Sequence, residues 1–392
     1  MIQLSKGAPQ SDEGGVSSDP WTSRRRLLTA LACWTADRVP ISTYELVGHD
    51  SHAWENRDPS YRRLMDRIRA DTDCIAMWGP AINEREGQSA HPTPVDQTVE
   101  RLGDLTRTTR IIHTPLGDLR TVNEVYDHVH TTWHIEHLCK SVEDVDRAMS
   151  IPYQPFTFDY SDLARIKSEV GERGIVMESI SDPAYLAADL MKFEEFTVWA
   201  FSETEHFART VDQIAERVME NLRRRLKAGV VDLYRICGPE YFTPPYLPPE
   251  MFRRFMLPHL TTMTRMIHDA GGKVRLHCHG KIARVLDMIL DTEPDGIDPC
   301  EPPPDGDLEL DQVKRRCAER GVSVFGNIEL KLLEHGTPGQ VRDEVRRIMD
   351  QAKAGGGFVI MPTAAPINIP LAARTEANYF AYIDAALEYG AY

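Results

Sequence analysis

The chain lacks the features of several protein classes. Its seven cysteines are scattered and include no CxxC pair, so no disulfide framework is expected. No apolar run approaches the roughly 18 residues of a membrane span. The net charge is −15 and no block of basic residues is present, which argues against a nucleic-acid partner. The polar first twenty residues contain no hydrophobic segment of signal-peptide length. We therefore expect a cytoplasmic protein with a flexible tail over residues 1–20.

From residue 21 onward, short apolar runs alternate with amphipathic stretches. The runs "DRVPISTYE" and "CIAMW" come first, and six more follow at residues 174–179, 230–236, 273–279, 295–298, 322–327 and 357–362. The stretches between them have helical periodicity, and several end in glycine. Eight such β/α units predict a closed (β/α)8 TIM barrel over residues 21–392. An open doubly wound sheet is the alternative, but no glycine-rich dinucleotide turn follows an early strand.

Two additions to the barrel are expected. The segment "TSRRRLLTALACW" predicts a helical extension before the first strand, with Thr22 or Ser23 as its cap. Residues 95–135 interrupt the β/α alternation. There the segment "TRTTRIIHTPLGDLRTV" alternates on a two-residue period around Pro115 and Gly117, which predicts an inserted β-hairpin.

The motif "HCHG" at the end of one predicted strand points to a metal site. Side chains alternate along a strand, so His277 and His279 face the same way, with α-carbons roughly 6.6 Å apart. Active sites of (β/α)8 barrels lie at this end of the strands. Two imidazoles at that spacing can converge on one ion. Paired structural histidines, or histidines that contact the substrate directly, are the alternative.

A third ligand would come from loops after the neighbouring strands. We favour Glu240, which lies in a proline-rich loop, and keep Cys300 and Glu301 as competitors. Two histidines, a carboxylate and one open position suit Zn²⁺ acting as a Lewis acid, although iron(II) or another divalent metal accepts the same ligands. The remaining candidates at the rim comprise Tyr241 beside Glu240 in the catalytic loop and a substrate-binding set of Arg235, Glu178, Asn327, Tyr44 and Trp78.

Several segments resemble the uroporphyrinogen decarboxylase superfamily. They are "SRRRLLTAL…DRVPIS", "HTPLGDLRTV", "LPPEMFRRFMLPHLTTMTRMIHDAGGKVRLHCHG", "FGNIELKLLEHGTPGQVRDEV" and "GGGFVIMPTAAPI". The resemblance implies a (β/α)8 barrel and a homodimer. It also implies one of two chemistries: metal-free decarboxylation of a tetrapyrrole, or zinc-dependent methyl transfer between a corrinoid protein and a thiol or tetrahydrofolate.

Departures from the family patterns favour the methyltransferase branch. An arginine-rich "MRQAGRY"-like stretch of the decarboxylases is replaced here by "STYELVGHDSHAW". The methyltransferases place zinc on a His-x-Cys-Gly strand end and a later cysteine. His277 matches the histidine, His279 stands at the first cysteine position, and Ala364 stands at the second. A harder N/O ligand set makes zinc a stronger Lewis acid, which favours an O- or N-linked methyl substrate over a thiol.

The expected function is therefore a metal-dependent methyltransferase or demethylase, with a corrinoid or tetrahydrofolate as acceptor and a corrinoid protein as a partner. Two alternatives stay open. One is a decarboxylase or other lyase that acts on a small carboxylic acid with the histidines as proton donor and electrophile. The other is a catalytically altered protein that binds a corrinoid or a tetrapyrrole, which the absence of the second cysteine at Ala364 supports.

Overall fold

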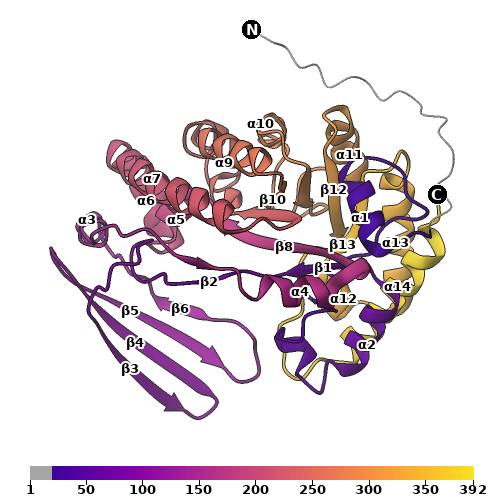
Figure 1. Ribbon diagram of the computed structural model, residues 1–392, viewed down its shortest axis with the longest axis horizontal. Helices are drawn as coiled ribbons and strands as arrows, with labels where there is room; N and C mark the ends of the chain where they lie inside the picture. The colour runs from indigo at the N-terminus through magenta and orange to yellow at the C-terminus, as the bar shows by residue number, and fades with distance from the viewer. Residues whose placement is uncertain (1–19) are drawn as a thin grey trace, which may run out of the picture.

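A computed structural model describes residues 20–392 of the chain, so the tail expected over residues 1–20 lies almost wholly outside the described residues. Its centre is a parallel sheet in the order β1-β8-β9-β10-β11-β12-β13 that curls around a common axis (Figure 1). The strands are β1 (Cys74–Met77), β8 (Gly174–Ser181), β9 (Leu233–Cys237), β10 (Lys273–Cys278), β11 (Gly296–Pro299), β12 (Ser323–Ile328) and β13 (Phe358–Pro362).

The two edges of this sheet are joined by the segment around Ile41. Ile41 forms a parallel bridge with Ile360 of β13. On its other side, the Ile41 carbonyl accepts a hydrogen bond of 2.8 Å from the Asp73 amide, immediately before β1. The segment "DRVPISTYE", predicted as the first strand, is thus a short bridge rather than a full strand. The bridge completes the ring, and the TIM-barrel-like fold expected from the β/α alternation is confirmed.

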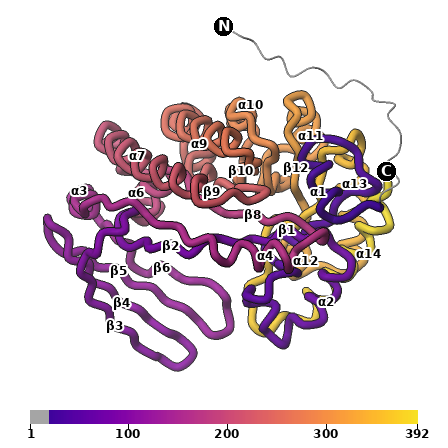
Figure 2. Tube along the Cα trace, viewed as in Figure 1, coloured from indigo at the N-terminus to yellow at the C-terminus, as the bar shows by residue number. Residues whose placement is uncertain are grey.

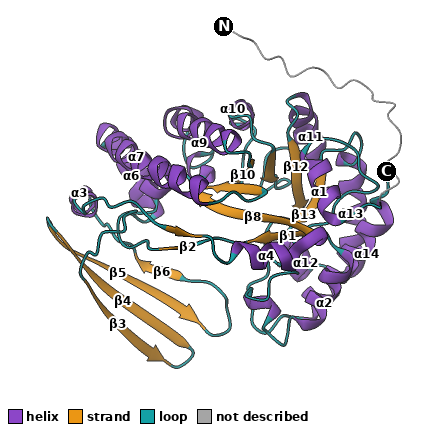
Figure 3. Ribbon diagram, in the orientation of Figure 1, coloured by secondary structure: helices purple, strands orange, loops and turns teal. Residues whose placement is uncertain are grey.

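Helices surround the sheet (Figure 3). The helical segments are α1 (Ser23–Leu31), η1 (Trp54–Asn56), α2 (Arg62–Asp71), α3 (Val142–Met149), α4 (Leu163–Val170), η2 (Gly171–Arg173), α5 (Pro183–Ala188), α6 (Phe193–Ser202), α7 (Thr204–Ala228), η3 (Pro239–Phe242), α8 (Pro249–Met251), η4 (Phe252–Met256), α9 (Leu257–Asp269), α10 (Leu286–Asp291), α11 (Leu310–Glu319), α12 (Leu330–His335), α13 (Pro338–Ala352) and α14 (Ala373–Tyr389). The predicted N-terminal helix is α1, and the Thr22 side chain caps it by accepting from the Arg25 amide. Within residues 20–392, no helix is both long and apolar enough to cross a membrane.

Alternation along the strands divides the core into two clusters. Side chains such as Ile175, Met177 and Phe325 point into the barrel and pack together with Tyr44. Residues of opposite parity, such as Val176 and Ile236, pack outward against the helices in a second, larger cluster. A strand residue's parity therefore decides whether its side chain reaches the barrel interior.

The insertion is larger than the predicted hairpin. β4 (Leu105–Thr114) and β5 (Gly117–Tyr126) form the hairpin around Pro115, with Thr114 opposite Gly117. β3 (Val95–Leu102) and β6 (Trp133–Glu136) extend it to a four-stranded antiparallel sheet. Two short strands, β2 (Ala81–Ile82) and β7 (Phe158–Asp159), pair nearby. The four-stranded sheet projects from one end of the barrel, and α3 packs against β5 (Figure 2).

Candidate active site

β10 brings His277 into the barrel. His277 is 4% exposed and shares the interior face with Arg275, two residues earlier. Across the sheet, His277 is in register with Cys237 of β9 and Asp298 of β11. Cys278, between the two histidines, points outward into the helix-facing cluster. The alternation predicted from the sequence therefore holds at His277.

Asp298 fixes the tautomer and orientation of His277. The Asp298 carboxylate lies 2.8 Å from His277 Nδ1 and 3.0 Å from Arg275 Nε. Burial acts to raise the pKa of Asp298, but the charge of Arg275 and the hydrogen bond with His277 outweigh it and hold that pKa below its ordinary value. Burial lowers the pKa of His277 to about 3. A neutral imidazole that donates Nδ1–H to an ionised carboxylate keeps the lone pair on Nε2.

His279 has its own carboxylate partner. Its Nδ1 is hydrogen-bonded to Glu301, whose second oxygen accepts from the Gly280 amide at 2.9 Å. Burial acts to lower the pKa of His279, but the hydrogen bond and charge of Glu301 raise it above its ordinary value. The rings of His277 and His279 stand nearly perpendicular, with centroids 4.5 Å apart. Both imidazoles thus use Nδ1 for a carboxylate and leave Nε2 for another partner.

Two further carboxylates are buried after the neighbouring strands. Glu240 lies on η3, directly after β9, and burial raises the pKa of Glu240. Its Oε2 atom has no hydrogen-bond partner among residues 20–392. Asp182 lies directly after β8 and caps α5, since its Oδ1 accepts from the Ala184 and Tyr185 amides at 2.9 Å each. Gly238 is required between them, because a Cβ there would lie 2.2 Å from Asp182 Oδ2.

The donors present fit a zinc ion in kind. As the side chains stand, the described part of the chain has no group of three His, Cys, Asp or Glu residues placed to hold a metal. The required atom types are nonetheless present: two imidazole Nε2 atoms on neighbouring rings, and the buried Glu240 oxygen that lacks a partner in the described structure and whose charge acts on His279. A carboxylate behind each imidazole is the usual outer support of a metal-binding histidine. Side-chain movement would have to complete the set.

Other predicted site residues also line the barrel interior. Arg235 is 5% exposed, and it donates to Glu45 at 2.8 Å and to the Tyr44 hydroxyl. The Tyr44 ring centroid lies 6.1 Å from that of His277. Asn327 is fully buried at the end of β12, where its side chain donates to the Cys300 carbonyl at 2.8 Å. Tyr44 and Arg235 thus place polar groups beside His277.

The structure places four predicted residues elsewhere and gives Glu301 another role. Glu178 has the opposite parity to Met177, so it points outward and pairs with Arg225 of α7.

Trp78 donates to Asp162 at 3.1 Å, and the Tyr241 ring packs 4.9 Å from that of Tyr185. The Cys300 thiol is buried in the helix-facing cluster. Glu301, expected as a competing ligand, supports His279 instead.

Three residues of the site were not among the predicted ones. Arg275 could have been found by counting two residues back from His277. Asp298 ends the apolar run "DGID" on the next strand and is in register with His277. Asp182 precedes a proline at a helix start, which indicates only a cap. Its proximity to Glu240 depends on the neighbouring strands and has no local sequence signal.

Because Asp182 is buried, we expect the free energy of unfolding to depend on pH. Burial raises the pKa of Asp182 to about 8, and the charge of Glu240 adds to the rise. Between its ordinary value and about pH 8, the folded state holds a proton that the unfolded state has released, so the free energy of unfolding falls as pH rises. Asp182→Asn keeps the capping oxygen and cannot titrate. Relative to this variant, the wild type should lose about 1 kcal/mol per pH unit between pH 5 and 8. Urea unfolding at several pH values checks this, and parallel curves for the two proteins would contradict it.

Comparisons with known proteins agree with this architecture. The sequence of residues 125–376 matches the family described as uroporphyrinogen decarboxylase (URO-D). A methylcobamide:CoM methyltransferase, MtaA, from Methanosarcina barkeri is 24% identical over 132 residues, which are 34% of this chain and 38% of that protein. The chain thus matches well under half the length of this curated relative. A methyltransferase from Methanosarcina mazei superposes with a TM-score of 0.58 at 16% identity, over 94% of this chain and 99% of that one.

The structural likeness extends over nearly the whole chain and shows a shared fold. The sequence match covers well over half of the chain, from the end of β5 into α14, and includes the strands that carry His277, Asp298 and Asn327. The protein belongs to the uroporphyrinogen decarboxylase (URO-D) family.

Proposed function

We propose that the protein is a zinc-dependent methyltransferase in which His277, His279 and Glu240 hold the metal. The observation that carries this proposal is the paired support of the histidines: Asp298 occupies Nδ1 of one and Glu301 occupies Nδ1 of the other. Such support orients the free nitrogen of an imidazole and raises its basicity toward a metal. The similarity to MtaA and the barrel shared with a second methyltransferase support the reaction class.

Zinc bound by two nitrogens and an oxygen would supply Lewis-acid polarisation of a substrate heteroatom. The chain's own residues prepare that position. Burial keeps His277 neutral, and the hydrogen bond from its Nδ1 to Asp298 leaves the lone pair on Nε2. Arg235, held by Glu45 and Tyr44, offers a fixed positive charge to an acidic part of the substrate or acceptor. The buried walls around Arg275 and Asn327 exclude water, which strengthens these interactions.

The substrate class follows from the ligands. A cysteine-rich zinc site donates charge and activates a thiol, whereas a nitrogen and oxygen set favours polarisation of an ether oxygen or an amine nitrogen. We therefore propose an O- or N-linked methyl group as the donor. A corrinoid, carried by a partner protein, or tetrahydrofolate is the proposed acceptor.

Chelation provides the direct test of this function. The purified protein is dialysed against a strong chelator and assayed with O-methyl and N-methyl donors, using cob(I)alamin or tetrahydrofolate as acceptor. Methyl transfer should fall at least about 100-fold and return when zinc is added. Dialysis without chelator is the control. Methyl transfer that survives complete removal of zinc would contradict the proposal.

A decarboxylase or lyase acting on a small acid is the second candidate. It is favoured by the hydrogen bond between His279 and Glu301, which raises the pKa of His279 and so keeps a proton available near neutral pH. Arg235 would bind the substrate carboxylate. Chelator-resistant release of carbon dioxide from small carboxylic acids would support this candidate over methyl transfer.

A further inference from the structure

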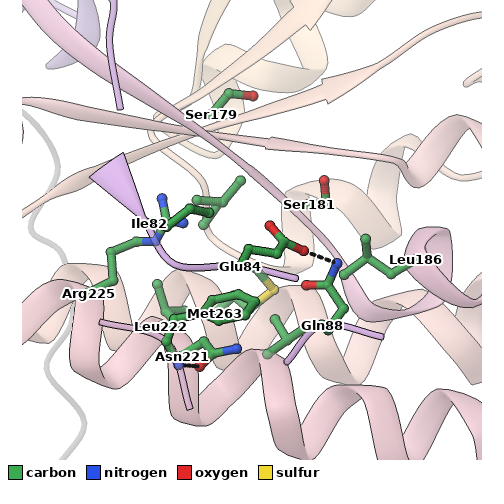
Figure 4. Close-up of a pocket in the computed structure, with 13 residues that line it drawn as sticks. Ile82, Glu84, Gln88, Ser179, Ser181, Leu186, Asn221, Leu222, Arg225 and Met263 are labelled. Atoms are coloured by element: carbon green, nitrogen blue, oxygen red, sulfur yellow. Dashed lines mark hydrogen bonds between the residues drawn. The ribbon is translucent and has the colours of Figure 1, made fainter. Parts of the chain in front are cut away.

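A cavity of about 240 Å³ lies beside the barrel rim, between β8, α7 and residues 82–88 (Figure 4). Ser179 and Ser181, at the end of β8, line one side of it, and Asn221 and Arg225 of α7 line the other. The cavity adjoins the candidate active site, because Ser179 Oγ lies 3.3 Å from Cys237 Sγ. Cys237 is itself in register with His277.

Asn221 has an unused hydrogen-bond donor at this cavity. The residue is 6% exposed, and its Oδ1 accepts from the Phe156 amide at 3.0 Å and from the Tyr153 hydroxyl at 3.2 Å. Its Nδ2 atom is buried without a partner in the structure of residues 20–392. A buried donor without an acceptor carries an energetic cost in the folded state. Asn221 lines the cavity (Figure 4), so a small shift of its buried amide would bring Nδ2 to an acceptor atom on a ligand placed there and offset this cost.

The charges around the cavity disfavour an anion. The guanidinium of Arg225 already pairs with Glu178. Glu84 is a second carboxylate at the lining, where it accepts from Gln88 at 2.9 Å (Figure 4). Burial raises the pKa of Glu84, which shows that a negative charge is already unfavourable there. An anionic ligand would add a third negative charge against a single guanidinium, so the ligand's acceptor should be uncharged.

The rest of the lining selects an apolar body. Ile82, Leu222 and Met263 converge on the cavity together with the Phe156 ring. Methionine sulfur and aromatic rings make favourable contacts with ligand rings. An apolar cavity of about 150 Å³ accepts benzene, so this larger one has room for a ring with a small substituent.

We propose that this cavity binds a small uncharged molecule with a ring-sized apolar body and one acceptor oxygen, which receives the Asn221 Nδ2 hydrogen bond. The assignment of that molecule as the methyl donor rests on the proposed function, whereas its binding does not. The ligand would sit at the rim with one end beside Ser179, the lining residue that contacts Cys237.

Binding of three ring compounds tests the site. The probes are 2-methoxyphenol, benzoate and benzylamine, titrated into the full chain by calorimetry or protein-observed NMR. The uncharged 2-methoxyphenol should bind at least about tenfold more tightly than the two charged rings. Tightest binding of benzoate or benzylamine, or no binding of 2-methoxyphenol, would overturn the proposal.

Variants locate the bound probe. Asn221→Asp keeps the oxygen that accepts from Phe156 and Tyr153 but removes the donor, so 2-methoxyphenol should bind about tenfold more weakly. Val218→Phe fills the cavity from α7 and should abolish binding without depending on Asn221. Val198→Phe is the matched control, since Val198 is 64% exposed on α6. Thermal melting confirms that each variant is folded. His277→Ala separates the two proposals: it should leave probe binding unchanged, and loss of binding would place the probe in the barrel centre and overturn this one.

Discussion

His277→Ala is expected to weaken zinc binding by more than about 100-fold, because loss of an outer carboxylate partner alone costs about 10–100-fold. The variant removes one of the two proposed nitrogen ligands and leaves Asp298 paired with Arg275. Methyl transfer should fall with the zinc content. The measurements are zinc per chain in the freshly purified protein and competition against a chromophoric chelator.

His335→Ala is the control for this substitution. The His335 side chain is 76% exposed on α12 and is not among the site residues, so its removal should leave the zinc content unchanged. Zinc stoichiometry equal to that of the wild type in His277→Ala would show that the ion, if present, is held elsewhere. That result would end the proposal of a histidine site.

Asp298→Ala is expected to lower the free energy of unfolding by about 3–5 kcal/mol, the usual cost of removing one partner of a buried ion pair. Arg275 would remain buried with its charge uncompensated, since both side chains are at most 2% exposed. His277 would lose the acceptor that orients it. Chemical unfolding monitored by circular dichroism gives the difference.

Asp305→Ala provides the matched comparison for Asp298. Asp305 also pairs with a cation, Lys331, but both side chains are about half exposed, so its loss should cost about 1 kcal/mol or less. The double variant Arg275→Met/Asp298→Ala should recover part of the stability lost in the single one, because it removes the buried charge. Equal losses for the Asp298 and Asp305 variants would contradict the role assigned to burial.

The barrel and its N-terminal helix could be predicted because they depend on local sequence patterns. Apolar runs that alternate with stretches of helical periodicity specify β/α units. The inward orientation of the His277 side chain follows from the two-residue period of a β-strand. The same rule explains the misplacement of Glu178. Its neighbours Ile175 and Met177 face inward, so the parity of β8 already assigns Glu178 to the outer face, where Arg225 meets it.

The partners of the histidines could not be predicted in the same way. The position of Glu301 after the next strand makes it a candidate ligand, but its pairing with His279 Nδ1 depends on side-chain rotamers across two loops. Of the four-stranded insertion, likewise, only the hairpin of β4 and β5 could be predicted from the sequence. β3 carries exposed polar residues through most of its length, so its sequence lacks the one-sided apolar alternation that marked β4 and β5.

The short bridge at Ile41, which closes the barrel, also determines whether the candidate active site is correctly formed. The chain that leaves this bridge reaches Tyr44 and Glu45 within a few residues, and both hold the Arg235 guanidinium. If the bridge at Ile41 did not form, Tyr44 and Glu45 would no longer hold Arg235 in place. Molecules in which the barrel is not closed would therefore lack activity as well as stability. The active fraction of a preparation should equal the fraction of molecules in which the Ile41 bridge has formed.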